Sequence, residues 1–399
     1  MDLQENYFPL LGQYVLEFVV ALVLVAGVYF LTRRWISKDL VARAFRWGML
    51  SLIYVSVSAF ALNAFMSTWG FRGEASPFGF ERMLDHTAER PYVYRVLSGE
   101  VIKRAARLIP KHLSEERRRW LLEESPLLQY RRPGEGWSLE KSKHWHVAYF
   151  YLFLTLLAAL FAARVLTQRV CDVTPLFADL APAVAALFLP LTFHLGGYFY
   201  DFPELLLMLL CLLSLVKWRP LWFYPLFVIA ILNKESNALL VTFFVALMWE
   251  RLPRRQLLLH AAAQLGIGAA IVWLLRMAFL GSQGAQGLFF FPLNVLFWLR
   301  PASYVKFITP YAPLIPVPRG ANLISLFLVA FLVLWEWRRK PAELKRLLLL
   351  PAVFVFPLFY VFGMMDEVRA LSLLFPGLYL LGCHTVNDVY GRLRTGADP

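Results

Sequence analysis

The sequence predicts an all-α protein: a polytopic transmembrane helical bundle with about 11 spans, forming a single integral membrane domain over residues 1–399. Hydrophobic residues make up 59% of the chain and charged residues only 17%, with a mean hydropathy of +0.56. Soluble domains carry about 25% charged residues. In addition, apolar runs near the ~20 residues that a helix needs to cross a bilayer recur along the whole chain.

The spans are expected where these apolar runs lie, at 13–31, 49–66, 146–165, 175–193, 203–217, 220–233, 236–249, 258–280, 321–337, 347–364 and 370–386. Two of them, 220–233 and 236–249, are only about 21 Å long at 1.5 Å per residue. That is short of a hydrocarbon core of ~30 Å. The turn at Lys234 and Glu235 is therefore expected below the outer surface, at the floor of a water-filled depression.

The net charge of +13 would suggest a nucleic-acid partner in a soluble protein, but here its distribution favours a membrane topology. Basic residues gather in alternate connections, at 32–48, 164–169, 217–219, 251–255 and 338–346, and in the C-terminal tail. Short basic connections mark the cytoplasmic side. The N-terminus is therefore expected outside and the C-terminus inside, with no nucleic-acid partner. The first span lacks a basic segment before it and is interpreted as a retained helix.

The long loop at 67–145 falls on the outer side and contains the stretch FERMLDHTAERPYVYRVLSGEVIKRAARLIP. Asp85 and Arg95 are its candidate site residues. Apolar positions from Val93 to Leu108 recur at helical spacing, with a basic opposite face. This pattern predicts an amphipathic helix, either at the membrane interface or on a lipid phosphate, or else a solvated surface helix.

A second outer segment, FHLGGYFYDFPELL, contributes His194, Tyr200, Asp201 and Glu204. Asp201 precedes a proline at the start of a predicted helix, so it is either a helix cap or a carboxylate that faces a cavity. Glu204 lies at the start of an apolar run, where an unpaired acid is costly.

Two further outer turns carry charges between apolar spans. The turn NKES contains Lys234 and Glu235, which form either a structural ion pair or part of a functional site. The stretch GMMDEVRALS contains Glu367 and Arg369, which form either a wet loop with an internal salt bridge or part of the same site. Between these turns, the Pro- and aromatic-rich segment 281–320 is expected to be an extracytoplasmic or re-entrant cap, or a plain interfacial loop.

These outer segments alternate in sign and suit transfer chemistry on a phosphorylated, lipid-linked donor. Arginine forks match phosphate oxygens, and lysine supplies a point charge. A phosphate leaves as an anion and needs cations, while an attacking hydroxyl needs a carboxylate to accept its proton. Carboxylates could also bind a divalent metal, although no metal motif is present and no metal ligand is assigned.

The ordered set RPYVYRVL, YFYDFPELL, LNKES and DEVRALSLLFPGLYLL resembles bacterial polytopic proteins related to the GT-C glycosyltransferases, over about residues 80 to 380. The resemblance implies a pocket on the non-cytoplasmic side, a polyprenyl-phosphate-linked sugar as donor, and inversion at the anomeric centre. It also implies a catalytic acid in the first large outer loop, and that role falls on Asp85.

The sequence therefore predicts a membrane glycosyltransferase of the bacterial inner membrane that acts on the extracytoplasmic side. Asp85 or Asp201 would be the base. The expected substrate-binding residues are Arg95, His194, Tyr200, Glu204, Lys234, Glu235, Glu367 and Arg369. The alternatives are a lipid-linked saccharide transporter or flippase, and a non-catalytic scaffold whose 67–145 loop binds a periplasmic partner.

Overall fold

The computed structural model describes residues 38–71, 76–110, 112–130, 137–193, 196–285, 289–308 and 316–395. The chain divides into two compact units, Met1–Val55 and Ser56–Pro399. The helix α2 (Lys38–Thr68) runs from the first unit into the second. The predicted span 13–31 lies outside the described residues.

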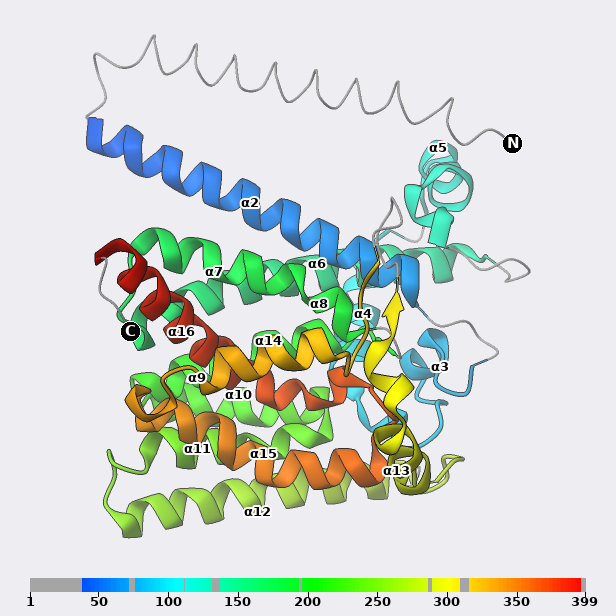
Figure 1. The fold of residues 1–399 in the computed structure, drawn as a ribbon. Helices are drawn as coiled ribbons and strands as arrows, with labels where there is room; N and C mark the ends of the chain where they lie inside the picture. The colour runs from blue at the N-terminus through cyan, green and yellow to red at the C-terminus, as the bar shows by residue number, and fades with distance from the viewer. Residues whose placement is uncertain are drawn as a thin grey trace. The chain divides into compact units, whose positions relative to one another are not determined.

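The described part of the second unit is mainly helical and contains one two-stranded antiparallel sheet, β1–β2 (Figure 1). Its first half contains α3 (Phe80–Leu84), η1 (Tyr92–Tyr94), α4 (Val96–Ala106), α5 (Glu115–Arg119), η2 (Trp120–Glu124), η3 (Pro126–Tyr130), α6 (Leu139–Val170), α7 (Pro175–Leu187), α8 (Leu189–Thr192) and α9 (Asp201–Val216). Its second half contains α10 (Pro220–Asn233), η4 (Glu235–Leu240), α11 (Val241–Met248), α12 (Arg254–Ala278), α13 (Phe291–Leu299), η5 (Pro301–Val305), β1 (Phe307–Ile308), β2 (Val317–Pro318), α14 (Leu323–Leu334), η6 (Trp337–Arg339), α15 (Ala342–Phe362), η7 (Val368–Leu374) and α16 (Phe375–Thr395).

The all-α prediction is confirmed, and six helices of the described chain are long and apolar enough to cross a membrane. They cover 39–68, 139–170, 175–192, 254–278, 342–362 and 368–393. A membrane location is therefore plausible by length and composition. The helices α9, α10, α11 and α14 are shorter, so the count of 11 spans and the orientation of the termini remain predictions.

Local sequence explains where several of these helices begin. Ser138 accepts a hydrogen bond from the backbone of Lys141 at the start of α6, and Thr174 does the same for Phe177 at the start of α7. Such side chains satisfy the first backbone N–H groups of a helix, which have no partner within it. The apolar stretch after Arg219 begins with a proline at the first position of α10, a position that tolerates a missing N–H.

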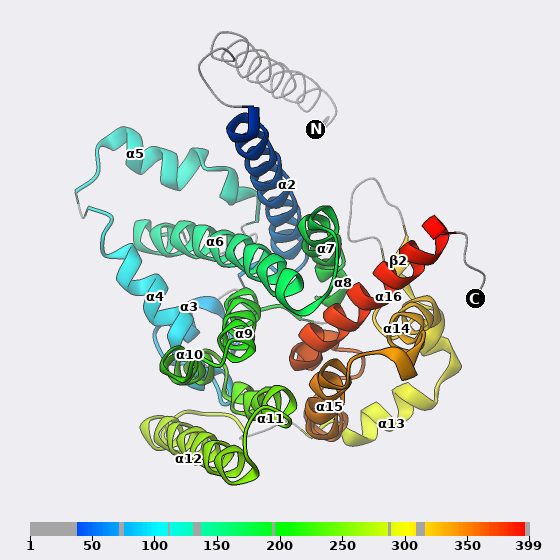
Figure 2. The ribbon, with the colours of Figure 1, turned by 90° about the vertical axis from the view of Figure 1, so that its left-hand side faces the viewer.

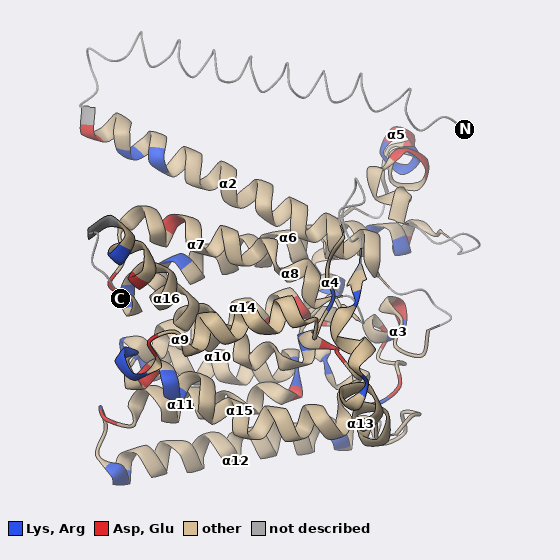
Figure 3. Ribbon diagram, viewed as in Figure 1, with Lys and Arg blue, Asp and Glu red and all other residues tan. Residues whose placement is uncertain are grey.

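Two buried clusters hold the second unit together. The larger one joins α9, α10, α11, α15 and α16, which lie beside one another in the end-on view of Figure 2. The smaller one is rich in aromatic residues and joins α3, α4 and α6 to the segment 193–202. In Figure 3 the middles of α10, α14 and α15 are almost free of charge, and charged positions gather toward the helix ends.

Candidate functional site

Four ion pairs connect the four segments that the sequence analysis places on the outer side. Lys234 Nζ lies 2.8 Å from Glu204 Oε2. Arg95 Nε lies 3.5 Å from Glu235 Oε2. Arg369 Nη1 lies 3.4 Å from Asp201 Oδ1, and its Nη2 bonds Glu367. The three cations expected in the site, Arg95, Lys234 and Arg369, therefore belong to one network, and each of them faces at least one carboxylate.

The first pair depends on a break in the helix. The last residue of α10 is Asn233, and Lys234 has an extended backbone with φ −160° and ψ 124° before η4 begins. This conformation lets the lysine side chain reach Glu204 in the first turn of α9. Ser372 Oγ also donates to Glu204, at 2.9 Å. The pair is almost completely buried, with side-chain exposures of 8% for the lysine and 1% for the glutamate.

Buried amides and hydroxyls fix this turn against its neighbours. Ser98 Oγ on α4 donates to Asn233 Oδ1 at 2.6 Å, and Asn233 Nδ2 donates to the Tyr200 carbonyl at 3.0 Å. Asn237 Nδ2 donates to the Ala230 carbonyl at 2.8 Å. Buried polar groups need such partners, since an unmade hydrogen bond costs about 1–3 kcal/mol. These contacts connect α4, the residue before α9 and the end of α10.

The two arginines are stacked on three tyrosine rings. The Arg369 guanidinium lies 4.4 Å from the centre of the Tyr198 ring, and Tyr198 stacks on Tyr200 with centroids 5.2 Å apart and planes 8° apart. The Arg95 guanidinium lies 4.5 Å from the Tyr200 ring and 4.8 Å from the Tyr92 ring. A desolvated cation over an aromatic face gains about 2 kcal/mol, so this stack helps to hold both charges in a buried place.

The Gly–Gly turn before these tyrosines is explained by close approach. A Cβ atom at Gly196 would lie 3.1 Å from Arg369 Nε and 3.3 Å from Glu367 Oε1. A Cβ atom at Gly197 would lie 2.6 Å from the ring of Phe65. Without side chains, both glycines let the turn pack directly against the Arg369 ion pairs and against the end of α2.

The segment that carries Glu367 and Arg369 is positioned by α13. The fully buried Asn294 donates to the carbonyls of Tyr360, at 2.8 Å, and Gly363, at 2.7 Å, and accepts a bond from the Met365 backbone at 2.6 Å. The segment 281–320, expected as a cap or interfacial loop, therefore supplies a helix that fixes the approach to η7.

Several buried polar atoms of this network have no hydrogen-bond partner among the described residues. They are Nε and Nη1 of Arg95, Nε of Arg369, the Tyr200 hydroxyl and Oε2 of Glu235. The Arg95 and Arg369 side chains are 10% and 9% exposed, so little water reaches them. Burial acts to lower the pKa of Arg95, but the Glu235 carboxylate and the neighbouring tyrosines raise it above its ordinary value, and the guanidinium stays charged.

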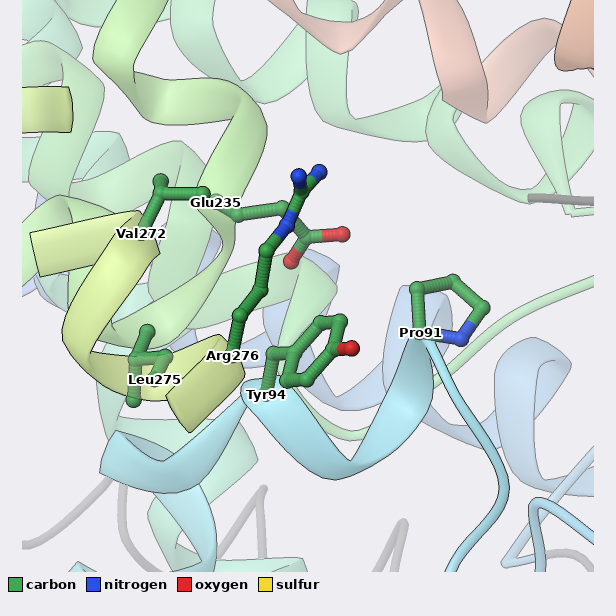
Figure 4. A pocket seen from close by; sticks show the side chains of 6 residues that line it. All are labelled: Pro91, Tyr94, Glu235, Val272, Leu275 and Arg276. Atoms are coloured by element: carbon green, nitrogen blue, oxygen red, sulfur yellow. The ribbon is translucent and has the colours of Figure 1, made fainter. Parts of the chain in front are cut away.

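A small cavity lies beside this network (Figure 4). Its volume is about 30 Å³, and it is lined by Pro91, Tyr94, Glu235, Val272, Leu275 and Arg276. In Figure 4 the Arg276 side chain passes beside the Glu235 carboxylate, and its guanidinium points away from the Tyr94 ring. A cavity of this size holds about one water molecule. The cavity therefore extends from the exposed end of α12 to the carboxylate of Glu235, a member of the network.

Of the residues expected to form the site, Arg95, Tyr200, Asp201, Glu204, Lys234, Glu235, Glu367 and Arg369 all belong to this network. Asp85 is exposed at the end of α3 and forms no ion pair within the described part of the chain. His194 lies outside the described residues. The described chain contains no group of three or more His, Cys, Asp or Glu residues that could hold a metal.

The sequence interpretation missed the supporting residues Ser98, Asn294 and Ser372, and it placed Asn233 in the NKES turn without giving it a role. Each is a polar residue within an apolar stretch, and that placement was a usable signal, because a buried polar group requires a partner. Comparison with known proteins adds no identification, since no family model, curated protein or solved structure matches the chain.

Proposed function

We propose that the protein is a membrane glycosyltransferase that transfers a sugar from a polyprenyl-phosphate-linked donor to an acceptor on the extracytoplasmic side of a bacterial inner membrane. The observation that carries this proposal is the pair of buried arginines, Arg95 and Arg369. Both retain N–H groups without an acceptor, and both lie on the same stack of tyrosine rings.

The unbonded donors suit a phosphate. Arg95 has two such N–H groups and Arg369 has one, and the Tyr200 hydroxyl is a further unbonded group of the network. Oxygens of a phosphate would satisfy them with charge-assisted bonds, which are about twice as strong as neutral ones. Glu235, Asp201 and Glu367 hold the arginine forks in position before a ligand arrives. Such preorganisation is what stabilises charge as it develops on a leaving group.

The choice of a sugar donor depends on the ordered motifs at 90–97, 198–206, 232–236 and 366–381, which resemble those of GT-C glycosyltransferases. Departure of the polyprenyl phosphate would place a negative charge at Arg95 and Arg369. The lipid tail would remain among apolar side chains. The described helices expose many of these, including Trp273, Leu274 and Met277 on α12.

The test is a transfer assay on purified protein in lipid nanodiscs, with a panel of polyprenyl-phosphate sugars and a mixed acceptor extract. Wild type is expected to transfer sugar from at least one donor, and Arg95→Gln is expected to lower that rate by about 10- to 100-fold. The loss of one charge-assisted hydrogen bond is worth about 1.5–3 kcal/mol, and 1.4 kcal/mol corresponds to a factor of ten.

The matched control is Arg251→Gln, because Arg251 forms an exposed ion pair with Glu343 at 2.7 Å, away from this network. It is expected to transfer at the wild-type rate. The proposal is wrong if folded wild type transfers sugar from no donor, or if Arg95→Gln is as active as Arg251→Gln.

A further inference from the structure

We propose that Glu235 is the proton acceptor of this transfer, taking the proton from an acceptor hydroxyl bound in the cavity beside Arg276. This inference rests on the proposed function and assigns a role that the sequence gave to Asp85 or Asp201. The network contains four carboxylates, and a base among them must have a free oxygen within reach of the hydroxyl.

Three of the four carboxylates are occupied. Glu204 accepts from Lys234 and Ser372 and is 1% exposed. Asp201 accepts from the Tyr198 backbone at 2.8 Å and faces Arg369. Glu367 bonds Arg369 and also accepts from the Met364 backbone at 3.4 Å. Such bonds occupy the carboxylate oxygens and stabilise the charged form.

Glu235 differs from these three in geometry. Its side chain is 26% exposed, the largest value of the four. Its one ion pair, with Arg95, spans 3.5 Å and is not a hydrogen bond, since neither Oε2 of Glu235 nor Nε of Arg95 has a hydrogen-bond partner among the described residues. It is therefore the carboxylate of the network that can still accept a proton without first losing a hydrogen bond.

The cavity gives an acceptor access to this carboxylate. Figure 4 shows Glu235 beside Arg276 at the end of α12, on one side of the cavity, with Tyr94 of η1 and the preceding Pro91 on the other. A volume of about 30 Å³ accommodates one hydroxyl group in place of a water. Arg276 is exposed and lines the cavity, where its positive charge would hold the acceptor oxygen against Glu235.

The step balances without any further reactant. The O–H bond of the acceptor breaks, and its proton passes to the Glu235 carboxylate. The acceptor oxygen forms a bond to the anomeric carbon as the bond from that carbon to the phosphate oxygen breaks, and the electron pair leaves with the polyprenyl phosphate. Protonation of Glu235 removes the negative charge that faces Arg95. The full charge of Arg95 then becomes available to the departing phosphate at the moment its charge develops.

The test measures single-turnover transfer at saturating donor, from pH 5 to 9, for wild type, Glu235→Gln, Glu235→Asp, Asp85→Asn and Asp201→Asn. Donor binding is measured separately, as the Tm increase caused by polyprenyl phosphate.

Glu235→Gln is expected to lower the transfer rate by about 10²- to 10⁴-fold, the usual contribution of a positioned base. Polyprenyl phosphate is still expected to raise the Tm of this variant. Glu235→Asp is expected to retain measurable transfer with an altered pH profile. Glu343→Gln, outside this network, serves as the control with wild-type activity.

Three outcomes would overturn the assignment. Glu235→Gln could retain more than a tenth of the wild-type rate, Glu235→Asp could show no altered pH profile, or Asp85→Asn or Asp201→Asn could lose more activity while still binding donor. In each case an active wild type leaves the proposed function intact. A wild type that transfers no sugar from any donor overturns both the function and this assignment.

Discussion

Replacing Lys234 by methionine is expected to lower the free energy of unfolding by about 3–5 kcal/mol, the usual cost of removing one partner of a buried ion pair. Glu204 would remain 1% exposed, with only Ser372 to bond its carboxylate. The same variant is expected to lose transfer activity, because Lys234 is the residue between α10 and η4, directly before Glu235. Thermal unfolding in detergent, followed by circular dichroism, measures the loss.

The double variant Lys234→Met with Glu204→Gln distinguishes the contribution of the ion pair to stability from that of the packing of the turn. It removes both charges and keeps a hydrogen-bond acceptor for Ser372, so it is expected to recover most of the lost stability. Equal losses in the single and double variants would show that Lys234 acts through packing of the turn and not through its charge.

Arg369→Lys is expected to lower transfer by more than about 100-fold even though it keeps the positive charge. The planar guanidinium of Arg369 faces Asp201, bonds Glu367 and lies over the Tyr198 ring, all at once. A lysine ammonium is a point charge on a flexible stem and cannot hold this arrangement. Each lost charge-assisted bond costs about 1.5–3 kcal/mol, so the loss of two accounts for this factor.

The control for this variant is Arg251→Lys, because Arg251 is also bonded to a glutamate but is far more exposed, at 36%. Exposed pairs contribute about 0–1 kcal/mol, so this change is expected to leave the transfer rate and Tm within error of wild type. If Arg369→Lys behaves like Arg251→Lys, the geometry of the guanidinium has no part in the activity.

The helices were largely predictable from the sequence because long apolar runs and their breaks determine them. The span expected at 220–233 has the same bounds as α10, and the break falls at Lys234, as the placement of that charge indicated. The segment 365–369 contains a feature that the apolar runs did not predict. It was expected to be a connection outside the spans, but Arg369 lies within η7 and is buried. Hydropathy cannot predict such burial, because it depends on partners contributed by other segments.

The sequence predicted most of the residues that belong to the site, but not which of them form ion pairs with one another. Charges between apolar runs are costly, and this cost indicated Glu204, Lys234 and Arg369. Lys234 and its partner Glu204 are 30 residues apart in the sequence, and Arg369 and its partner Asp201 are 168 residues apart. Only packing of the helices decides such pairs. The same packing leaves Asp85 exposed and turns Glu235 toward the cavity.

The central claim is that the buried arginines form a binding site for the phosphate of a polyprenyl-linked ligand. Its most direct test is the Tm of the purified protein with polyprenyl phosphate, with polyprenol of the same length and with inorganic phosphate. A ligand at 100 times its Kd stabilises a folded protein by about 2.7 kcal/mol. Polyprenyl phosphate is expected to raise the Tm of wild type and not that of Arg95→Gln, and polyprenol is expected to raise neither. An equal Tm increase with polyprenol, or an undiminished increase in Arg95→Gln, would contradict the claim.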